Sequence, residues 1–164
     1  MSIILDLGDD GIETLDIDET NIYFDTQNTG FATKTGWVSK NEGFLVVDNN
    51  NDGKITQQSE MFGSETKSGF EDLNAYDSNN DGVINSLDTK FNELKIWQDL
   101  NENGITDEGE LKSLEQVGID SIGLNVIDLN LEHNQNTITG MSTYTTTDGN
   151  THNIYNVNFA FNKI

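Results

Sequence analysis

Residues 77–88, DSNNDGVINSLD, and residues 99–110, DLNENGITDEGE, are two copies of one twelve-residue pattern. Oxygen-bearing side chains stand at positions 1, 3, 5 and 12 of each copy and glycine stands at position 6, as in an EF-hand calcium loop. Ca²⁺ is a hard cation that binds six to eight oxygen atoms, so the chain has to wind around it. Position 6 needs a sharp turn that glycine makes without strain. The two segments therefore predict tandem calcium loops.

The predicted ligands are carboxylates, side-chain amides and the backbone carbonyl of position 7. They are Asp77, Asn79, Asp81, Val83 and Asp88 in the first loop, and Asp99, Asn101, Asn103, Ile105 and Glu110 in the second. Between the loops, Leu87, Phe91, Leu94 and Trp97 recur at helical spacing. We therefore expect a helix over 86–98 that leaves one loop and enters the next.

Three further segments repeat the pattern less completely. The segment at 48 offers Asp48, Asn50, Asp52, the carbonyl of Lys54 and Glu60, which lies one place beyond position 12. The segment at 6 offers Asp6, Asp10 and the carbonyl of Ile12, with glycine at position 3. For both, a polar turn without metal remains the alternative. The segment at Asp25 has Thr29, a poor ligand, at position 5, so we expect it to keep the loop shape with weak or no metal affinity.

The remaining periodicity predicts a single domain, residues 1–164, of the α+β class. Residues 1–120 are expected to carry the calcium loops and short helices, over 70–76 and over 111–117, the latter ending at Gly118. Residues 121–164 alternate apolar and polar side chains around a turn at 148–150, which predicts a small antiparallel sheet as a scaffold. A buried strand is expected over 43–47.

The composition is strongly acidic, with 29 acidic and 8 basic residues and a formal net charge of −21. Such a charge repels nucleic acid and anionic membranes, so neither is an expected partner. Disorder is the alternative that a charge of this size raises, but the aromatic residues and periodic apolar segments argue against it for the metal-bound state. We expect folding to be coupled to the binding of about three or four Ca²⁺ ions, in a monomer.

Other features narrow the function. The chain has no cysteine, which suits either a cytosolic protein or an exported one that folds on meeting extracellular calcium. No segment has the length of a membrane span, and no signal peptide is recognisable, so export would use a signal outside this segment. No nucleophile and base are paired in the sequence, His133 and His152 lie in polar stretches, and we name no catalytic residue. Clustered carboxylates and amides favour calcium over zinc.

The order of these segments resembles the calcium-dependent self-processing module of RTX proteins of the FrpC type, over roughly residues 3 to 125. The residues that carry the resemblance are Leu5-Asp6-Leu7, Asp10-Gly11-Ile12-Glu13-Thr14, Thr35-Gly36-Trp37-Val38, Asp48 to Ile55, Ser59-Glu60-Met61-Phe62-Gly63, Gly69-Phe70, Asp77 to Ile84, Trp97-Gln98-Asp99-Leu100-Asn101 and Leu111 to Ser121.

The resemblance implies that calcium-driven folding promotes cleavage of an Asp–Pro bond at the N-terminal edge of the module, through an aspartyl anhydride that a lysine amine can open to an isopeptide. It further implies a parent protein exported by type I secretion to the cell surface or beyond, with the upstream polypeptide and a lysine of a target protein as partners. The Asp–Pro pair would align with Met1-Ser2, and this chain contains no proline. The segment therefore resembles a form without the upstream half.

Three other functions remain open. A purely structural calcium domain of a secreted protein or adhesin would need no bond cleavage. A dockerin-like recognition module would have two such loops but not these long flanks. A calmodulin-like sensor would need more than the three methionines present.

Overall fold

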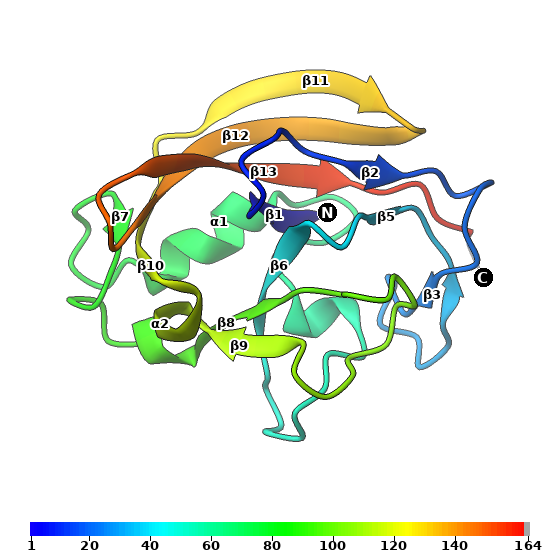
Figure 1. Ribbon diagram of the computed structural model, residues 1–164, viewed down its shortest axis with the longest axis horizontal. Helices are drawn as coiled ribbons and strands as arrows, with labels where there is room; N and C mark the ends of the chain where they lie inside the picture. Colours follow the sequence, from blue (N-terminus) through cyan, green and yellow to red (C-terminus); the bar gives the residue numbers. More distant parts are fainter. Residues whose placement is uncertain (163–164) are drawn as a thin grey trace.

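The computed structural model describes residues 1–162, and β-strands dominate it. Strands make up 40% of these described residues and helices 11%. A nine-stranded antiparallel sheet runs in the order β7-β10-β12-β13-β1-β6-β8-β9, with β11 paired to β12, and it curls into a half-barrel (Figure 1). Neighbours in this sheet are often far apart in sequence, so the sheet draws on both the first 120 residues and the rest of the chain.

The strands of the large sheet are β1 (Ser2–Asp6), β6 (Glu42–Val47), β7 (Val83–Ile84), β8 (Leu94–Trp97), β9 (Leu111–Ser113), β10 (Ile119–Gly123), β11 (Ile127–His133), β12 (Asn136–Thr146) and β13 (Thr151–Asn158). Two small sheets pair β2 (Thr14–Leu15) with β5 (Trp37–Val38), and β3 (Tyr23–Phe24) with β4 (Thr33–Lys34). The helical elements are α1 (Gly69–Leu73), α2 (Leu114–Val117) and the 3-10 turns η1 (Gln58–Glu60), η2 (Asn74–Tyr76) and η3 (Phe91–Glu93).

Strand β1 lies at the centre of the sheet, between β13 and β6, and all five of its residues are buried. Because side chains alternate along a strand, β1 supplies both hydrophobic cores. Ile3 and Leu5 belong to the core beneath α1 and α2, while Ile4 belongs to the opposite core with Trp37 and Trp97. The sheet therefore holds one packed layer on each face.

The predicted α+β class with tandem EF-hand-like loops is wrong. Among residues 1–162 the helices are too short to form the helix pairs of an EF-hand, and the loops are joined to β-strands instead. The expected helix over 86–98 is replaced by η3 and β8. Leu94, Ile96 and Trp97 are buried because β8 pairs with β6, whereas Leu87, the first residue of the expected apolar stripe, is 72% exposed. Short apolar runs do not distinguish a helix from a buried strand.

Several local predictions agree with the structure. Helix α1 and turn η2 cover 69–76 and enter the loop at 77. Helix α2 ends at Gly118, which adopts φ 82°, although the preceding Leu111 lies in strand β9 and not in the helix. The strand expected over 43–47 is β6, and the alternating segments after residue 121 form antiparallel strands, with β12 and β13 joined at the turn 148–150.

Candidate functional site

Five loops share one backbone conformation. Position 4 of each loop is left-handed, with φ between 54° and 56°, at Asp9, Asn28, Asn51, Asn80 and Glu102. Position 6 is a glycine with φ between 73° and 90°, at Gly11, Gly30, Gly53, Gly82 and Gly104. The glycine requirement at position 6 follows from the sequence pattern, but the left-handed residue at position 4 was not part of it.

The aspartate at position 1 organises each loop by accepting backbone N–H groups from the far side of the turn. Gly11 donates to Asp6 at 2.8 Å, and Gly30 donates to Asp25 at 2.8 Å. The corresponding glycine bonds are 2.8 Å at Asp48, 2.9 Å at Asp77 and 2.7 Å at Asp99. Position 5 then accepts the N–H of position 7 in three loops, at Lys54, Val83 and Ile105.

The loop at 99 is the most deeply anchored. Asp99 is 1% exposed and accepts a 2.8 Å hydrogen bond from Nε1 of Trp37. Glu110, at position 12, folds back to accept the N–H of Leu100 at 2.8 Å and lies 3.4 Å from Nε1 of Trp97. Both predicted carboxylates therefore lie at the inner end of the loop, against the aromatic core.

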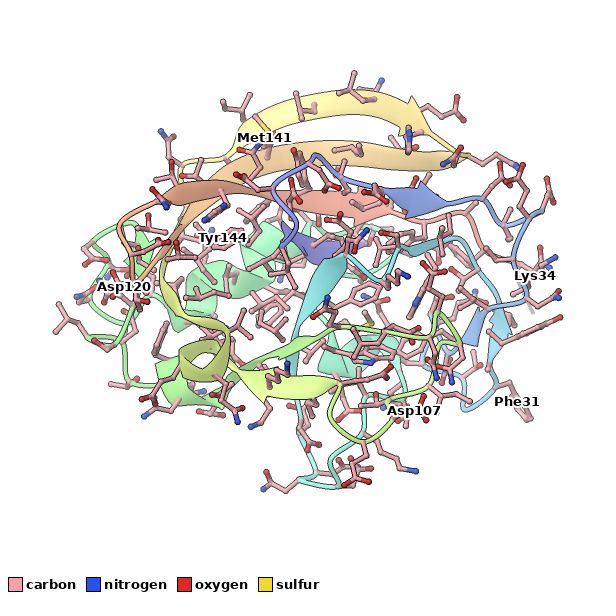
Figure 2. All side chains as sticks on the ribbon, viewed as in Figure 1. Phe31, Lys34, Asp107, Asp120, Met141 and Tyr144 are labelled. Carbon is pink, nitrogen blue, oxygen red and sulfur yellow. The ribbon has the colours of Figure 1, made fainter. Side chains whose placement is uncertain are left out.

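Asp107 in the same loop was missed as a candidate ligand. Its Oδ2 accepts hydrogen bonds from Nδ2 of Asn101 and Nδ2 of Asn103, both at 2.9 Å, and these bonds lower the pKa of its carboxyl group. Figure 2 shows Asp107 in the loop that follows β8. Position 9 of an EF-hand loop often binds the ion through water, so the loop pattern already contained the signal.

In the loop at 48, the carboxylate of Glu60 folds back onto the loop although it lies one place beyond position 12. Turn η1 carries Glu60 back so that its carboxylate accepts the N–H groups of Thr56, at 3.1 Å, and Asn49, at 3.3 Å. Carboxylate oxygens of Asp48, Asp52 and Glu60 lie within 4.8 Å of one another. Asn50, the predicted ligand at position 3, is exposed.

The loop at 77 is closed by Asp88, which accepts the N–H groups of Ser78 and Asn85, each at 2.9 Å. Its carboxylates are more spread out: in the described part of the chain, Asp77, Asp81 and Asp88 are not among the acidic groups that converge within 4.8 Å. Asn79 is exposed. This loop therefore shows less carboxylate convergence than the loop at 48.

The loops at 77 and 99 do not form the tandem pair that the sequence predicted. The loop at 99 instead faces the loop at 48, where the N–H of Ile55 donates to Oγ1 of Thr106 at 3.0 Å; both residues stand at position 8. The loop at 77 leads into β7, which pairs with β10. The pairing differs because β8, in place of a helix, separates the loops at 77 and 99.

The loop at 6 is completed by a residue outside it. Glu42 on β6 lies directly across from Asp6 on β1, and carboxylate oxygens of Asp6, Asp10 and Glu42 lie within 4.8 Å of one another. Glu42 is 0% exposed and Asp6 is 3% exposed. Both carboxylate oxygens of Glu42 and Oδ1 of Asp6 are buried without a hydrogen-bond partner.

Burial raises the pKa of Glu42 to about 8, and the carboxylates of Asp6 and Asp10 add to this rise. The backbone of Glu13 acts in the opposite direction and lowers this pKa. Sequence reasoning missed Glu42 because it lies far along the chain from Asp6. The available signal was a carboxylate at the head of the fully apolar strand 43–47, where an unpaired charge is expensive.

The loop at 25 keeps the shape that was expected of it. Asp25 is 5% exposed and accepts the N–H groups of Thr29, at 2.9 Å, and Gly30. Position 12 is Gly36, so the loop has no closing carboxylate of its own. The histidines take no part in these clusters: His133 is exposed and lies 2.7 Å from Oγ1 of Thr14, and His152 stacks on Tyr144.

Comparison with known proteins gives a consistent result. The chain matches the family described as the SPM domain over residues 3–160. The iron-regulated protein FrpA of Neisseria meningitidis serogroup C is 42% identical over 159 residues, and the match covers 91% of this chain. The chain spans 14% of the length of that relative. Among the described helices, none combines the length and apolarity that crossing a membrane requires.

Proposed function

The chain belongs to the SPM domain family, and on that premise we propose that it is a calcium-binding, FrpC-type self-processing module. In this proposal Ca²⁺ drives folding, and the folded module promotes cleavage of an Asp–Pro bond at its N-terminal edge when the chain carries one. The family membership supports the module type, and the geometry of the loops supports calcium.

The observation that carries the calcium proposal is the pair of buried carboxylates, Asp6 and Glu42, which converge with the exposed carboxylate of Asp10. Burying carboxylates without hydrogen bonds or a counter-charge costs several kcal/mol. The cations recorded in ion pairs within residues 1–162 are Lys67, on Asp72, and His152, on the exposed carboxylate of Asp9; neither touches Glu42. A bound divalent cation would satisfy all three orphaned oxygens at once, and an all-oxygen donor set suits Ca²⁺.

The residues that would hold calcium are the carboxylate, amide and position-7 groups of four loops. They are Asp6, Asp10, Ile12 and Glu42; Asp48, Asn50, Asp52, Lys54 and Glu60; Asp77, Asn79, Asp81, Val83 and Asp88; and Asp99, Asn101, Asn103, Ile105 and Glu110. Bound calcium would supply positive charge to a chain of net charge −21 and so relieve its self-repulsion. A largely unstructured chain should become compact with about three or four ions.

The self-processing reaction needs an aspartate followed by proline. A carboxylate oxygen of the aspartate side chain bonds to the carbonyl carbon of the same residue, and the C–N bond to proline breaks. The proline nitrogen takes a proton from solvent and leaves as an amine, while the aspartate becomes a cyclic anhydride. Water opens the anhydride to two carboxyl groups, or a lysine amine opens it to an isopeptide. Nucleophile and carbonyl share one residue, so their effective concentration is high.

One experiment tests both parts of the proposal. The double variant Met1→Asp, Ser2→Pro, extended by an upstream fusion protein, is titrated with Ca²⁺ while circular dichroism follows folding and mass spectrometry follows fragments. We expect compaction at millimolar calcium, followed by release of two fragments and, with added amine, of adducts. Proline is tolerated at the first residue of a strand such as β1.

A folded, calcium-loaded double variant that yields neither fragments nor adducts would favour the second candidate, a purely structural calcium domain. That candidate is supported by the β-rich architecture, in which the loops at 6, 48, 77 and 99 adjoin strands of the large sheet. A chain with the same circular dichroism spectrum in the presence and absence of calcium would contradict both candidates. Export of the parent protein and a lysine of a target protein as acceptor are further parts of the proposal that this experiment leaves to separate tests.

A further inference from the structure

Residue 1 is held at three points by polar groups from distant parts of the chain. Its nitrogen donates to the carbonyl of Ser64 at 2.7 Å, its carbonyl oxygen accepts from Nε2 of Gln58 at 2.6 Å, and its Sδ accepts from Nδ2 of Asn156 at 3.3 Å. A single residue position is thus fixed at its backbone nitrogen, its backbone oxygen and its side chain.

Burial and a second hydrogen bond hold the side-chain amide of Gln58 in position to donate to this carbonyl. Its side chain is buried, with 5% exposure, and its Nε2 has a second acceptor in the carbonyl of Gly63 at 3.1 Å. Both N–H groups of the amide are therefore directed at carbonyl oxygens. Gly63 adopts φ 97°, and a Cβ there would lie 2.8 Å from the carbonyl oxygen of Met1, so the turn closes tightly over the same atom.

Asn156 is equally fixed, on the side-chain flank of residue 1. It is 1% exposed, its Oδ1 accepts the N–H of Gly69 at 2.9 Å, and its Nδ2 donates to Oγ1 of Thr139 at 2.6 Å. The second N–H of this buried amide meets only the thioether of Met1, and a thioether is a weak acceptor. An oxygen at the δ position would satisfy the amide better.

Aspartate places an oxygen at that position. Sδ of methionine and Oδ of aspartate are separated from Cα by the same number of bonds, so Sδ of Met1 marks where a carboxylate oxygen of aspartate would lie. We infer that Gln58 and Asn156 form the reaction pocket for residue 1, an inference that rests on the proposed self-processing function. Gln58 stabilises the oxyanion that forms when the carbonyl of residue 1 is attacked, and Asn156 orients the attacking carboxylate.

The step that uses these groups is the first one of the reaction. The C–O bond forms between a carboxylate oxygen and the carbonyl carbon of residue 1, and the electron pair of the C=O bond moves onto the carbonyl oxygen. The hydrogen bond from Nε2 of Gln58 already points at that oxygen and strengthens as negative charge develops. Removing one such donor lowers reaction rates by about 100- to 1,000-fold in other acyl-transfer sites.

The test uses the extended Met1→Asp, Ser2→Pro chain in saturating calcium, with the first-order rate of fragment release measured on protein shown to be folded. Gln58→Ala should lower the rate about 100-fold or more. The matched control is Gln57→Ala, because Gln57 precedes it in the chain and its side chain donates only to Ser59 among the recorded bonds. That control should cleave within about twofold of the parent. Equal rates for Gln58→Ala and the parent would overturn the role of Gln58 while self-processing stands.

Asn156 is tested in the same background by a readout that does not need cleavage. In a Met1→Asp chain that retains Ser2, the side-chain amide signal of Asn156 should move in the NMR spectrum as the carboxyl group of residue 1 titrates. Asn156→Ala should raise the pKa of that carboxyl group, and Asn153→Ala, an exposed change on the same strand, should not. An Asn156 signal that ignores the titration would overturn the pocket even if the Asp–Pro chain fails to cleave. If the Asn156 signal follows the titration but the Asp–Pro chain does not cleave, the pocket around residue 1 is supported and the proposed self-processing reaction is contradicted.

Discussion

The loops at 6 and at 99 have the same backbone turn but obtain their closing carboxylate in different ways. The loop at 99 carries Glu110 within its own twelve residues, and Glu110 folds back onto the N–H of Leu100. The loop at 6 depends on Glu42, which reaches it only because β1 pairs with β6. One loop can assemble locally, whereas the other exists only when the central sheet has formed. An ion bound at the loop at 6 would therefore link strands β1 and β6 through Asp6 and Glu42.

Among the variants that test this difference between the loops at 6 and 99, Asp99→Ala is expected to have the largest effect. The change removes a predicted ligand and leaves the buried Nε1 of Trp37 without its acceptor. We therefore expect the free energy of unfolding in calcium to fall by more than about 3 kcal/mol, and the chain not to become compact at millimolar calcium. Circular dichroism and tryptophan fluorescence during a calcium titration measure it. Glu108→Ala, at an exposed position of the same loop, is the control. A variant that folds at the same calcium concentration as the parent would show that this loop does not drive folding.

Two glycines separate loop conformation from loop packing. Gly104 and Gly53 adopt φ 73° and 75°, but a Cβ at 104 would lie 2.9 Å from Ile22 Cγ2, while a Cβ at 53 has nothing within 4 Å. Gly53→Ala should therefore cost about 1 kcal/mol from the left-handed backbone alone, and Gly104→Ala about 3 kcal/mol. Urea unfolding in saturating calcium measures both. Equal costs would mean that the buried position of the loop at 99 adds nothing to the strain.

Glu42→Gln tests the loop at 6. It should remove one ion from the stoichiometry measured by native mass spectrometry while the rest of the fold persists. It should also reduce the stabilisation that calcium adds by about 2.7 kcal/mol, the linkage value at a hundredfold excess over Kd. Without calcium the variant should be more stable than the parent at neutral pH, because the parent has to protonate Glu42 in order to bury it and glutamine does not. An unchanged ion count would exclude Glu42 as a ligand.

A further expected effect is a pH dependence of calcium affinity confined to the loop at 6. Glu42, with its pKa raised to about 8, keeps its proton at neutral pH in the metal-free fold, so calcium has to displace that proton. Affinity at this site should rise about tenfold per pH unit between roughly pH 5 and 8 and level off above. In the metal-free fold the same raised pKa makes stability fall as pH rises through that range.

Calcium titrations at several pH values, compared between the parent and Glu42→Gln, check this slope. Glu42→Gln should lose this pH dependence at the loop at 6, while calcium binding at the loop at 99 should stay as in the parent. A slope of the same size in the variant would show that the displaced proton does not come from Glu42.

Much of the candidate site could be predicted from the sequence. The loop pattern located the turns at 6, 25, 48, 77 and 99, including the weak one at 25, because each turn is specified by neighbouring residues. Glu60 was predicted as the acid of its loop although it stands one place late. The ordered motifs also predicted the family, which the match over residues 3–160 confirms. Calcium as the ligand stays a prediction.

The parts that failed depend on contacts between distant residues. Leu94 to Trp97 form a strand and not a helix because β6 offers them a partner, and the loop at 99 faces the loop at 48 for the same reason. Tyr144 of β12, labelled in Figure 2, is a further example. Its hydroxyl group donates to the carbonyl of Asp6 at 2.6 Å, a contact that no local sequence pattern predicts.

By itself, the sequence determined the acidic charge, the five turns and the family, since each is written in contiguous residues or in their order along the chain. Only the tertiary structure decided that Glu42 completes the first loop and that Gln58 and Asn156 enclose residue 1. Those groups lie on different strands and turns, and the free energy that brings them together comes from burying the two cores of the sheet, which no short stretch of the chain contains.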